Sequence, residues 1–280
     1  MAPEWIAWIE ENIARGVRPQ RLIDTLLQHR FTRAEAEREV ISRLPGQSRP
    51  AAAPAAASGS GYRIEAGGPP PGNVIEIGGH RIGVRLRLQA PKIVVLDNVL
   101  STDECAELIE LSRSKLARST TVDEATGRTE VHEHRTSSGT FFGLNETPFI
   151  ARLDARIAAL MQVPVENGEG LQILNYQVGG EYRPHYDYFP PEQPGSAPHI
   201  ARGGQRTATL VIYLNRVDDG GGTAFPAVGL TVAPEPGSAV YFSYCDSAGN
   251  LDPRTYHGGD PVARGEKWIA TKWVRQRAYR

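Results

Sequence analysis

The chain is poor in cysteine, and it contains no long apolar run. Only Cys105 and Cys245 occur among its 280 residues. Two cysteines are too few for a disulfide framework and are typical of a reducing compartment, so we expect a cytoplasmic protein. No stretch of about 18 apolar residues occurs, so we expect no membrane-spanning helix. The formal net charge of −1 and the dispersed basic residues argue against a nucleic-acid-binding protein.

The first 44 residues have the apolar spacing of short helices. Apolar residues recur at helical intervals in residues 5–13 and 22–27, and Thr32 with Glu35 fits a capping box that would begin a third helix. Residues 1–44 are therefore predicted to form a small helical module. Two roles are open for this module: a solvated appendage, or a unit that docks a partner.

A change of composition follows this module. In residues 45–61, fifteen of the seventeen residues are Pro, Gly, Ala or Ser, a composition that cannot build a core. Further glycines and prolines extend the predicted linker over residues 45–72. The main domain should therefore span residues 73–280.

The main domain is predicted to be mainly β with flanking helices, an α+β arrangement. Two helices are expected at residues 101–115 and 146–161. Strands are expected around residues 80–88, 92–100, 171–178, 207–215, 223–225, 230–233, 239–244 and 268–275. Because most of these strands follow one another without intervening helices, we expect a double-sheet β core braced by the two helices.

Two histidines and one aspartate form a candidate metal site. Side chains at i and i+2 of a strand share one face, so His185 and Asp187 can offer an imidazole and a carboxylate to the same ion. His257, from a remote strand, would complete the set and leave coordination positions open, as in non-haem iron(II) sites. His132 and His134 are a rival pair, but nothing near them in the sequence completes a site.

Lys267 follows His257 by ten residues and is the candidate anchor for an acidic cosubstrate. Trp268, Ile269 and Trp273 flank it, so its ammonium group can lie at the end of an apolar pocket. A dicarboxylate needs such a partner, because burying its far carboxylate unpaired is prohibitive.

Several motifs of this chain resemble the prolyl 4-hydroxylases, a branch of the iron(II)/2-oxoglutarate dioxygenases. The similarity covers roughly residues 92–275. It is carried by residues 175–187 (NYQVGGEYRPHYD), 206–209 (RTAT), 213–215 (YLN), 221–226 (GGTAFP) and 265–268 (GEKW). The resemblance implies a double-stranded β-helix, or jelly-roll, core. It also implies iron(II) as the metal, 2-oxoglutarate and O2 as cosubstrates, and ascorbate as the reductant.

The resemblance assigns roles to residues around the metal. His185, Asp187 and His257 would be the iron ligands. Lys267 would bind the distal carboxylate of 2-oxoglutarate, and the hydrogen-bonding neighbours of that carboxylate would be Tyr176 and Thr223.

The resemblance also marks a substrate side. Tyr182 and Arg206 occupy positions that line the substrate groove in the family, and Arg135 and Ser137 belong to a segment that closes over a peptide. Arg275 departs from the plant and algal pattern, which tends to have a histidine near the substrate there.

The long, Pro-rich insertion at residues 190–204 also departs from the family pattern. It contains glycines that could act as hinges, so we expect it to be a mobile wall of the site. This insertion and the segment of Arg135 and Ser137 would form two mobile walls, which suit an extended peptide. We therefore predict hydroxylation of a prolyl residue in a peptide or protein.

Three alternatives stay open on the sequence. The first is a hydroxylase of a free amino acid such as proline or pipecolate, with Arg206 and Arg275 clamping the substrate carboxylate. The second is a catalytically silent binding protein of the same fold, although the intact set of two His, one Asp and one Lys argues against it. The third is a zinc hydrolase, which would want a general base and no dicarboxylate anchor.

Overall fold

A computed structural model of the chain divides into two compact units, Met1–Ala57 and Ser58–Arg280. The structure describes residues 3–14, 17, 19–29, 31–41, 43, 61–65, 67–119, 121–122, 129–130 and 136–279. Most of the predicted linker, residues 45–60, lies outside the described residues, and the three-part division of the chain stays a prediction.

The first unit has three helices, α1 (Pro3–Ala14), α2 (Pro19–Gln28) and α3 (Arg33–Ile41). Their buried side chains form one apolar cluster that consists of Ile9, Leu22, Ile23, Leu26, Ala36 and Val40. The predicted capping box is present before α3, because the Thr32 amide donates to Glu35 Oε2 at 2.9 Å and the Glu35 amide donates to Thr32 Oγ1 at 3.3 Å.

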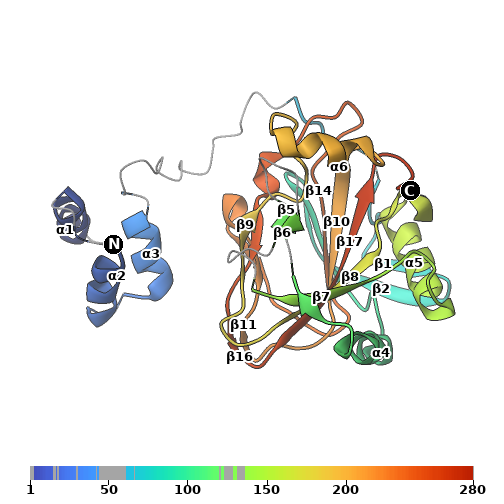
Figure 1. The fold of residues 1–280 in the computed structure, drawn as a ribbon, viewed down its shortest axis with the longest axis horizontal. Helices are drawn as coiled ribbons and strands as arrows, with labels where there is room; N and C mark the ends of the chain where they lie inside the picture. The colour runs from blue at the N-terminus through green and yellow to red at the C-terminus, as the bar shows by residue number, and fades with distance from the viewer. Residues whose placement is uncertain are drawn as a thin grey trace. The chain divides into compact units, whose positions relative to one another are not determined.

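The second unit is built on a nine-stranded antiparallel sheet (Figure 1). In spatial order its strands are β1 (Val74–Ile77), β2 (His80–Leu88), β3 (Lys92–Asp97), β14 (Ala239–Ser243), β10 (Arg206–Tyr213), β17 (Lys267–Arg275), β8 (Leu171–Tyr176), β7 (Ser138–Phe142) and β4 (Ala117–Arg118). The strands β10 and β17 lie side by side at its centre (Figure 1).

A four-stranded antiparallel sheet faces the larger one across an apolar core. Its order is β13 (Leu230–Val232), β12 (Thr223–Phe225), β15 (His257–Gly259) and β9 (Tyr182–His185). Two small ribbons pair β11 (Asp219–Gly220) with β16 (Val262–Arg264), and β5 (Thr121–Val122) with β6 (Thr129–Glu130). The predicted double-sheet core is confirmed.

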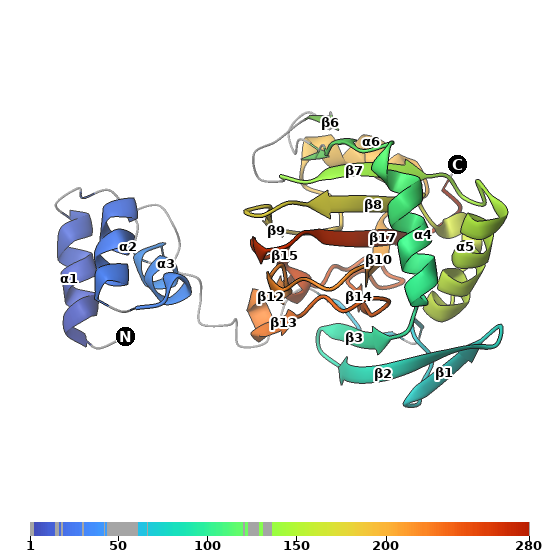
Figure 2. The ribbon, with the colours of Figure 1, turned by 90° about the horizontal axis from the view of Figure 1, so that it is seen from below.

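Two helices cover the outer face of the larger sheet, α4 (Thr102–Arg113) and α5 (Pro148–Met161) (Figure 2). Ser101 and Glu104 form a complete capping box at the start of α4, and Thr147 caps α5. The remaining helices are short: η1 (Val165–Asn167), η2 (Pro194–Ser196), α6 (Ala197–Ala201), η3 (Pro226–Val228) and η4 (Pro253–Thr255). Among the described residues, no helix has the length and apolarity needed to cross a membrane.

Alternation along β17 sends its side chains into two different cores. Trp268, Ala270 and Val274 pack toward the helices, whereas Ile269 packs toward the smaller sheet. Since successive side chains of a strand point to opposite faces, Lys267 lies on the same side as Ile269, between the two sheets. The fold therefore directs this lysine inward.

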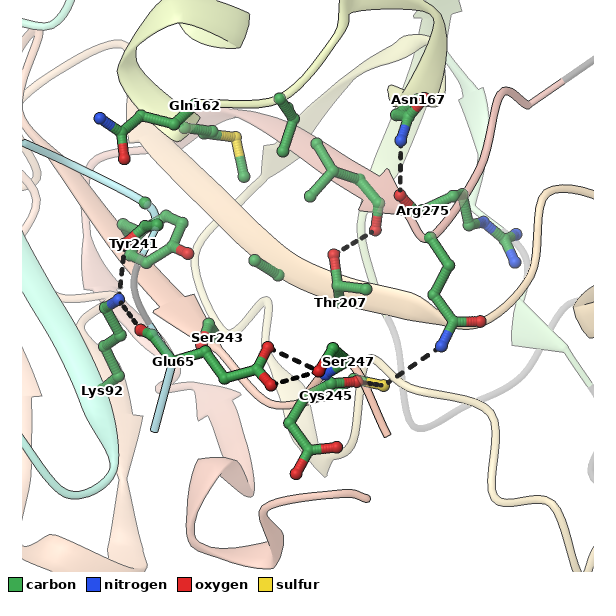
Figure 3. A pocket seen from close by; sticks show the side chains of 18 of the residues that line it. Glu65, Lys92, Gln162, Asn167, Thr207, Tyr241, Ser243, Cys245, Ser247 and Arg275 are labelled. Atoms are coloured by element: carbon green, nitrogen blue, oxygen red, sulfur yellow. Dashed lines mark hydrogen bonds between the residues drawn. The ribbon is translucent and has the colours of Figure 1, made fainter. Parts of the chain in front are cut away.

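Residues 61–65, 67 and 68, which composition places in the linker, belong to the second unit and contact its larger sheet and the loop after β14. Lys92 Nζ donates to the carbonyl oxygens of Glu65 at 2.8 Å and Gly67 at 2.5 Å, and the Glu65 carboxylate binds Ser247 (Figure 3). The Arg63 amide donates to Asp246 Oδ2 at 2.9 Å.

A cavity of about 560 Å³ adjoins this segment (Figure 3). The candidate metal ligands and Lys267 are not among the residues that line it. The cavity is therefore separate from the candidate active site.

Candidate active site

The neighbouring strands β9 and β15 of the smaller sheet, with the residues that follow β9, bring the three predicted metal ligands together. His185 ends β9, His257 begins β15, and the two residues are direct partners in the pairing of these strands. We predicted that Asp187 would belong to the same strand as His185. In the structure it lies two residues beyond the end of β9. One ligand atom from each side chain lies within 4.8 Å of the others. Asp187 Oδ1 is 3.5 Å from His185 Nε2, and Oδ2 is 3.6 Å from His257 Nε2.

Both imidazole rings are oriented by backbone carbonyl groups. His185 Nδ1 lies 2.9 Å from the Arg183 carbonyl oxygen, and His257 Nδ1 lies 3.0 Å from that of Thr255. A carbonyl oxygen only accepts, so Nδ1 carries the hydrogen in each ring and Nε2 keeps a free lone pair. This is the arrangement that prepares a histidine to bind a metal.

Asp187 is buried and held as a carboxylate. Thr209 Oγ1 donates to its Oδ2 at 2.6 Å, and the Tyr244 hydroxyl lies 2.9 Å from that Oγ1. Burial alone would raise the pKa of Asp187, but His257 and His185 hold it well below its usual range. Burial also lowers the pKa of His257 to about 4, against the opposing effect of Asp187. Neutral imidazoles and an ionised carboxylate are the forms that bind a metal, so the donor set fits iron(II).

Lys267 is a buried cation surrounded by aromatic rings. It is 3% exposed, and within the described part of the chain its Nζ makes no hydrogen bond or close ion pair. Its Nζ lies 5.6 Å from the centre of the Tyr176 ring and 6.0 Å from that of Tyr213. Burial lowers the pKa of Lys267 to about 8, and the nearby carboxylate of Asp260 opposes this shift. The Tyr213 hydroxyl donates to Thr223 Oγ1 at 2.7 Å.

Comparison with known proteins identifies the family. Residues 171–275 match the 2OG-Fe(II) oxygenase superfamily. Prolyl 4-hydroxylase 5 of Arabidopsis thaliana is 42% identical over 202 residues, which are 65% of this chain and 68% of that protein. Prolyl 4-hydroxylase 1 of the same plant is 42% identical over 204 residues, covering 68% of this chain and 70% of that protein. The chain belongs to the prolyl 4-hydroxylase family of 2OG-Fe(II) oxygenases.

A solved structure agrees with this assignment. A viral collagen prolyl hydroxylase from Paramecium Bursaria Chlorella virus-1, in its 2OG complex, matches with a TM-score of 0.52 and 27% identity. The match covers 65% of this chain and 95% of that one. As a member of this family, the chain is a 2-oxoglutarate-dependent dioxygenase with a jelly-roll core, and iron(II) and 2-oxoglutarate are its cofactor and cosubstrate. The silent protein and the zinc hydrolase are thereby set aside.

Two of the predicted groove residues border the metal ligands. Tyr182 stacks on His185, with ring centroids 3.7 Å apart and an interplanar angle of 23°. Arg206 Nη1 donates to the backbone carbonyl of Asp187 at 3.3 Å, and its guanidinium binds Glu169 through Nε at 2.7 Å and Nη2 at 2.9 Å. Arg206 therefore supports an iron-ligand candidate through its backbone.

The other predicted substrate residues are placed differently. Ser137 is fully buried, and its hydroxyl donates to Ser119 Oγ at 2.9 Å, so the structure encloses it. Arg275 is 3% exposed, and its Nε donates to Glu169 Oε1 at 2.6 Å. Arg135 lies outside the described residues, as do His132 and His134 of the rival pair. A substrate role for Ser137, Arg275 or Arg135 stays a prediction.

The insertion at residues 190–204 differs from the mobile wall that we expected. It contains η2 and α6, and contacts fix both of its ends. Gln205 Oε1 accepts from the Phe189 amide at 2.9 Å, while Gln205 Nε2 donates to the Phe189 carbonyl at 2.6 Å. These two bonds close the insertion into a loop with a fixed base.

Sequence reasoning missed Glu169, Thr209, Tyr244 and the indole of Trp273. Glu169 is a buried carboxylate two residues before the fully buried strand β8, and a lone acidic residue at such a position indicates a buried cationic partner. Trp273 faces the Lys267 side of β17, and among the described residues its buried Nε1 has no hydrogen-bond partner. No comparable signal marks Thr209 or Tyr244 in the sequence.

Proposed function

We propose that this dioxygenase hydroxylates a prolyl residue within a peptide or protein, with conversion of 2-oxoglutarate to succinate and CO2. One observation carries the proposal. The cluster of His185, Asp187 and His257 and the buried Lys267 belong to the same two facing sheets, in a chain 42% identical to Prolyl 4-hydroxylase 5 of Arabidopsis thaliana.

The chain's own residues hold and orient the reactants. We propose His185, Asp187 and His257 as the iron ligands, through the two Nε2 atoms and a carboxylate oxygen that Thr209 orients. When bound, iron(II) with 2-oxoglutarate and O2 supplies the oxidising chemistry for an unactivated C–H bond.

The cosubstrate contacts follow from the burial of Lys267. Its ammonium group would bind the distal carboxylate, and it lies near the Tyr176 ring and the Tyr213–Thr223 hydrogen bond. The hydroxyl groups of Tyr176, Tyr213 and Thr223 can each donate a hydrogen bond to an oxygen of that carboxylate. Excluding water from this pocket strengthens the pairing of charges.

The substrate would approach on the side of Tyr182, Arg206 and Trp273. Arg206 lies 3.9 Å from the centre of the Trp273 ring, so the two side chains form one surface beside Asp187. Trp273 Nε1 itself is enclosed and has no hydrogen-bond partner among the described residues, so we assign it no contact with the substrate.

A free amino acid is disfavoured because its charged clamp is already engaged. That reading requires Arg206 and Arg275 to bind a substrate carboxylate. In the structure both guanidinium groups bind the carboxylate of Glu169 instead. A peptide needs no such clamp.

The test is substrate-stimulated turnover. Proline-containing peptides should stimulate succinate formation and gain one oxygen by mass spectrometry, with fragment masses that place it on proline. Free proline and pipecolate are the comparison. Robust hydroxylation of a free amino acid, with all peptides inert, would overturn the substrate proposal and leave the reaction class intact.

Three finer expectations are also proposals. Ascorbate should act as the reductant, so its omission should shorten the linear phase of succinate formation. The free, buried Cys105 and Cys245 suit a reducing cytoplasm. Partner docking by the N-terminal helices stays a prediction, and pull-down with residues 1–44 would test it.

A further inference from the structure

Arg275 binds the backbone of the insertion at residues 190–204. Its Nη1 donates to the carbonyl oxygens of His199 at 3.0 Å and Gly204 at 2.9 Å. Its Nε donates to Glu169 Oε1 at 2.6 Å. One buried guanidinium thus joins the end of β17, the segment that leads into β8, and α6 with the end of the insertion.

The same contacts connect the insertion to the metal side of the site. Phe189 is two residues beyond Asp187, and both Arg206 and Arg275 lie over its ring, at 4.9 Å and 5.0 Å from the centroid. His199, in α6, stacks on Phe189 with ring centroids 5.0 Å apart and an interplanar angle of 8°. The insertion therefore stands directly beside Arg206 and the substrate side.

The charges make this arrangement interdependent. Glu169 is one buried carboxylate, and it faces two guanidinium groups, so it neutralises only one positive charge. The carbonyl dipoles of His199 and Gly204 supply the remaining stabilisation for Arg275. Displacing the insertion would leave a buried guanidinium short of acceptors, which is costly.

We infer that Arg275 is a specificity-determining positioning residue: it fixes residues 190–204 as a rigid wall beside Arg206 and so sets which peptides reach the metal site. The inference rests on the proposed function for its substrate class. It assigns Arg275 no contact with substrate, in contrast to the expectation from sequence. Lysine cannot replace it, because an ammonium group lacks the planar fork that reaches Glu169 and two carbonyl groups at once.

The experiment compares Arg275→Ala and Arg275→Lys with Arg277→Ala in the iron-loaded full chain. Arg277 is exposed on the same chain end and contacts the insertion through its backbone amide, which the substitution keeps. Hydrogen exchange of residues 193–205 and the KM values for peptide and for 2-oxoglutarate are measured.

Both Arg275 variants should exchange residues 193–205 faster by about tenfold or more, since both lose the guanidinium hydrogen bonds to the carbonyl groups of His199 and Gly204. They should also raise the KM for peptide by about the same factor and leave the KM for 2-oxoglutarate within about twofold. Arg277→Ala should match the wild type. Unchanged exchange would overturn the clamp, and faster exchange with unchanged peptide KM and product pattern would overturn the specificity role. If every peptide is inert in the wild type, the proposed function fails, whereas the clamp is still decided by exchange.

Discussion

Lys267 and Tyr176 are direct partners in the register between β17 and β8, and the lysine Nζ stands 5.6 Å from the centre of the tyrosine ring. The two side chains point into the space between the sheets from neighbouring strands. Backbone hydrogen bonds between the two strands set this pairing, so the anchor that we propose for 2-oxoglutarate does not depend on a loop.

Lys267→Ala should weaken 2-oxoglutarate binding strongly. Loss of a buried charge-assisted contact costs about 2–5 kcal/mol, or roughly 30- to 5,000-fold in apparent KM. Iron content should stay normal. The matched control is Arg264→Ala, because Arg264 is the nearest other cation in sequence and is largely exposed beside Asp218. A normal dependence on 2-oxoglutarate concentration in Lys267→Ala would show that another cation binds the distal carboxylate.

The pH dependence of 2-oxoglutarate binding should follow the ionisation of Lys267. Burial lowers its pKa to about 8, so the ammonium form is present below pH 8 and is lost as the pH rises through that value. The apparent KM should therefore rise above pH 8.

Asp260→Asn tests the cause of this limb. The carboxylate of Asp260 raises the pKa of Lys267, so its neutral replacement should move the alkaline limb to lower pH. KM profiles of both proteins from pH 6 to 9.5 would measure the shift. If the pH at which KM rises is the same in both proteins, Asp260 does not influence the ionisation of Lys267.

Removing one candidate metal ligand should abolish turnover. His257→Ala leaves two protein ligands, and we expect iron affinity and succinate formation to fall by more than about 100-fold, since changes to supporting residues alone cost up to that factor. Metal analysis after dialysis measures the loss. His80→Ala is the control. His80 begins β2 and contacts the carbonyl oxygen of Asn98, so it lies outside the cluster of candidate ligands. Full activity in His257→Ala would contradict the assignment.

A buried ion pair should hold α5 against the sheet. Lys272 Nζ and Asp154 Oδ1 are 2.7 Å apart, with side chains 3% and 0% exposed. Asp154→Ala leaves an uncompensated buried charge and should lower the free energy of unfolding by about 3–5 kcal/mol in urea titrations. The exposed pair of Arg216 and Glu235 has the same 2.7 Å separation, so Arg216→Ala should cost about 0–1 kcal/mol. Equal losses would argue against burial as the cause.

Truncation should distinguish the linker from the segment that contacts the sheet. A protein beginning at Gly61 should fold and convert 2-oxoglutarate. One beginning at Asn73 lacks the acceptors of Lys92 and should lose at least about 2 kcal/mol of stability, because hydrogen bonds to charged groups are removed. Thermal unfolding compares the two. Identical melting would mean that residues 61–72 contribute nothing to the fold.

Local signals were enough to predict the β core, both long helices and the metal ligand candidates. The cap at Ser101 marks the start of α4, and the alternation of apolar and basic residues marks β2. The shared carboxylate of Glu169 could not be predicted, because Arg206 and Arg275 are 37 and 106 residues away in the chain. Only the folded sheet brings these charges together.

The same limit explains Ser137 and the insertion. A motif places Ser137 near the substrate segment, but its burial depends on the contact with Ser119 across a neighbouring strand. The glycines of residues 190–204 indicated hinges, whereas the base that fixes this loop is formed by Gln205 and by Arg275 from β17.

The two-sided use of β17 restricts how this strand can change. Its odd-numbered positions carry the proposed cosubstrate anchor Lys267 and the proposed insertion clamp Arg275, and its even-numbered positions carry Trp268 and the ion pair to α5. A register slip of one residue would turn Lys267 toward the helices and Trp268 into the cosubstrate pocket. Insertion or deletion of one residue between Lys267 and Lys272 would therefore reverse the facing of either the proposed anchor or the ion pair and the proposed clamp.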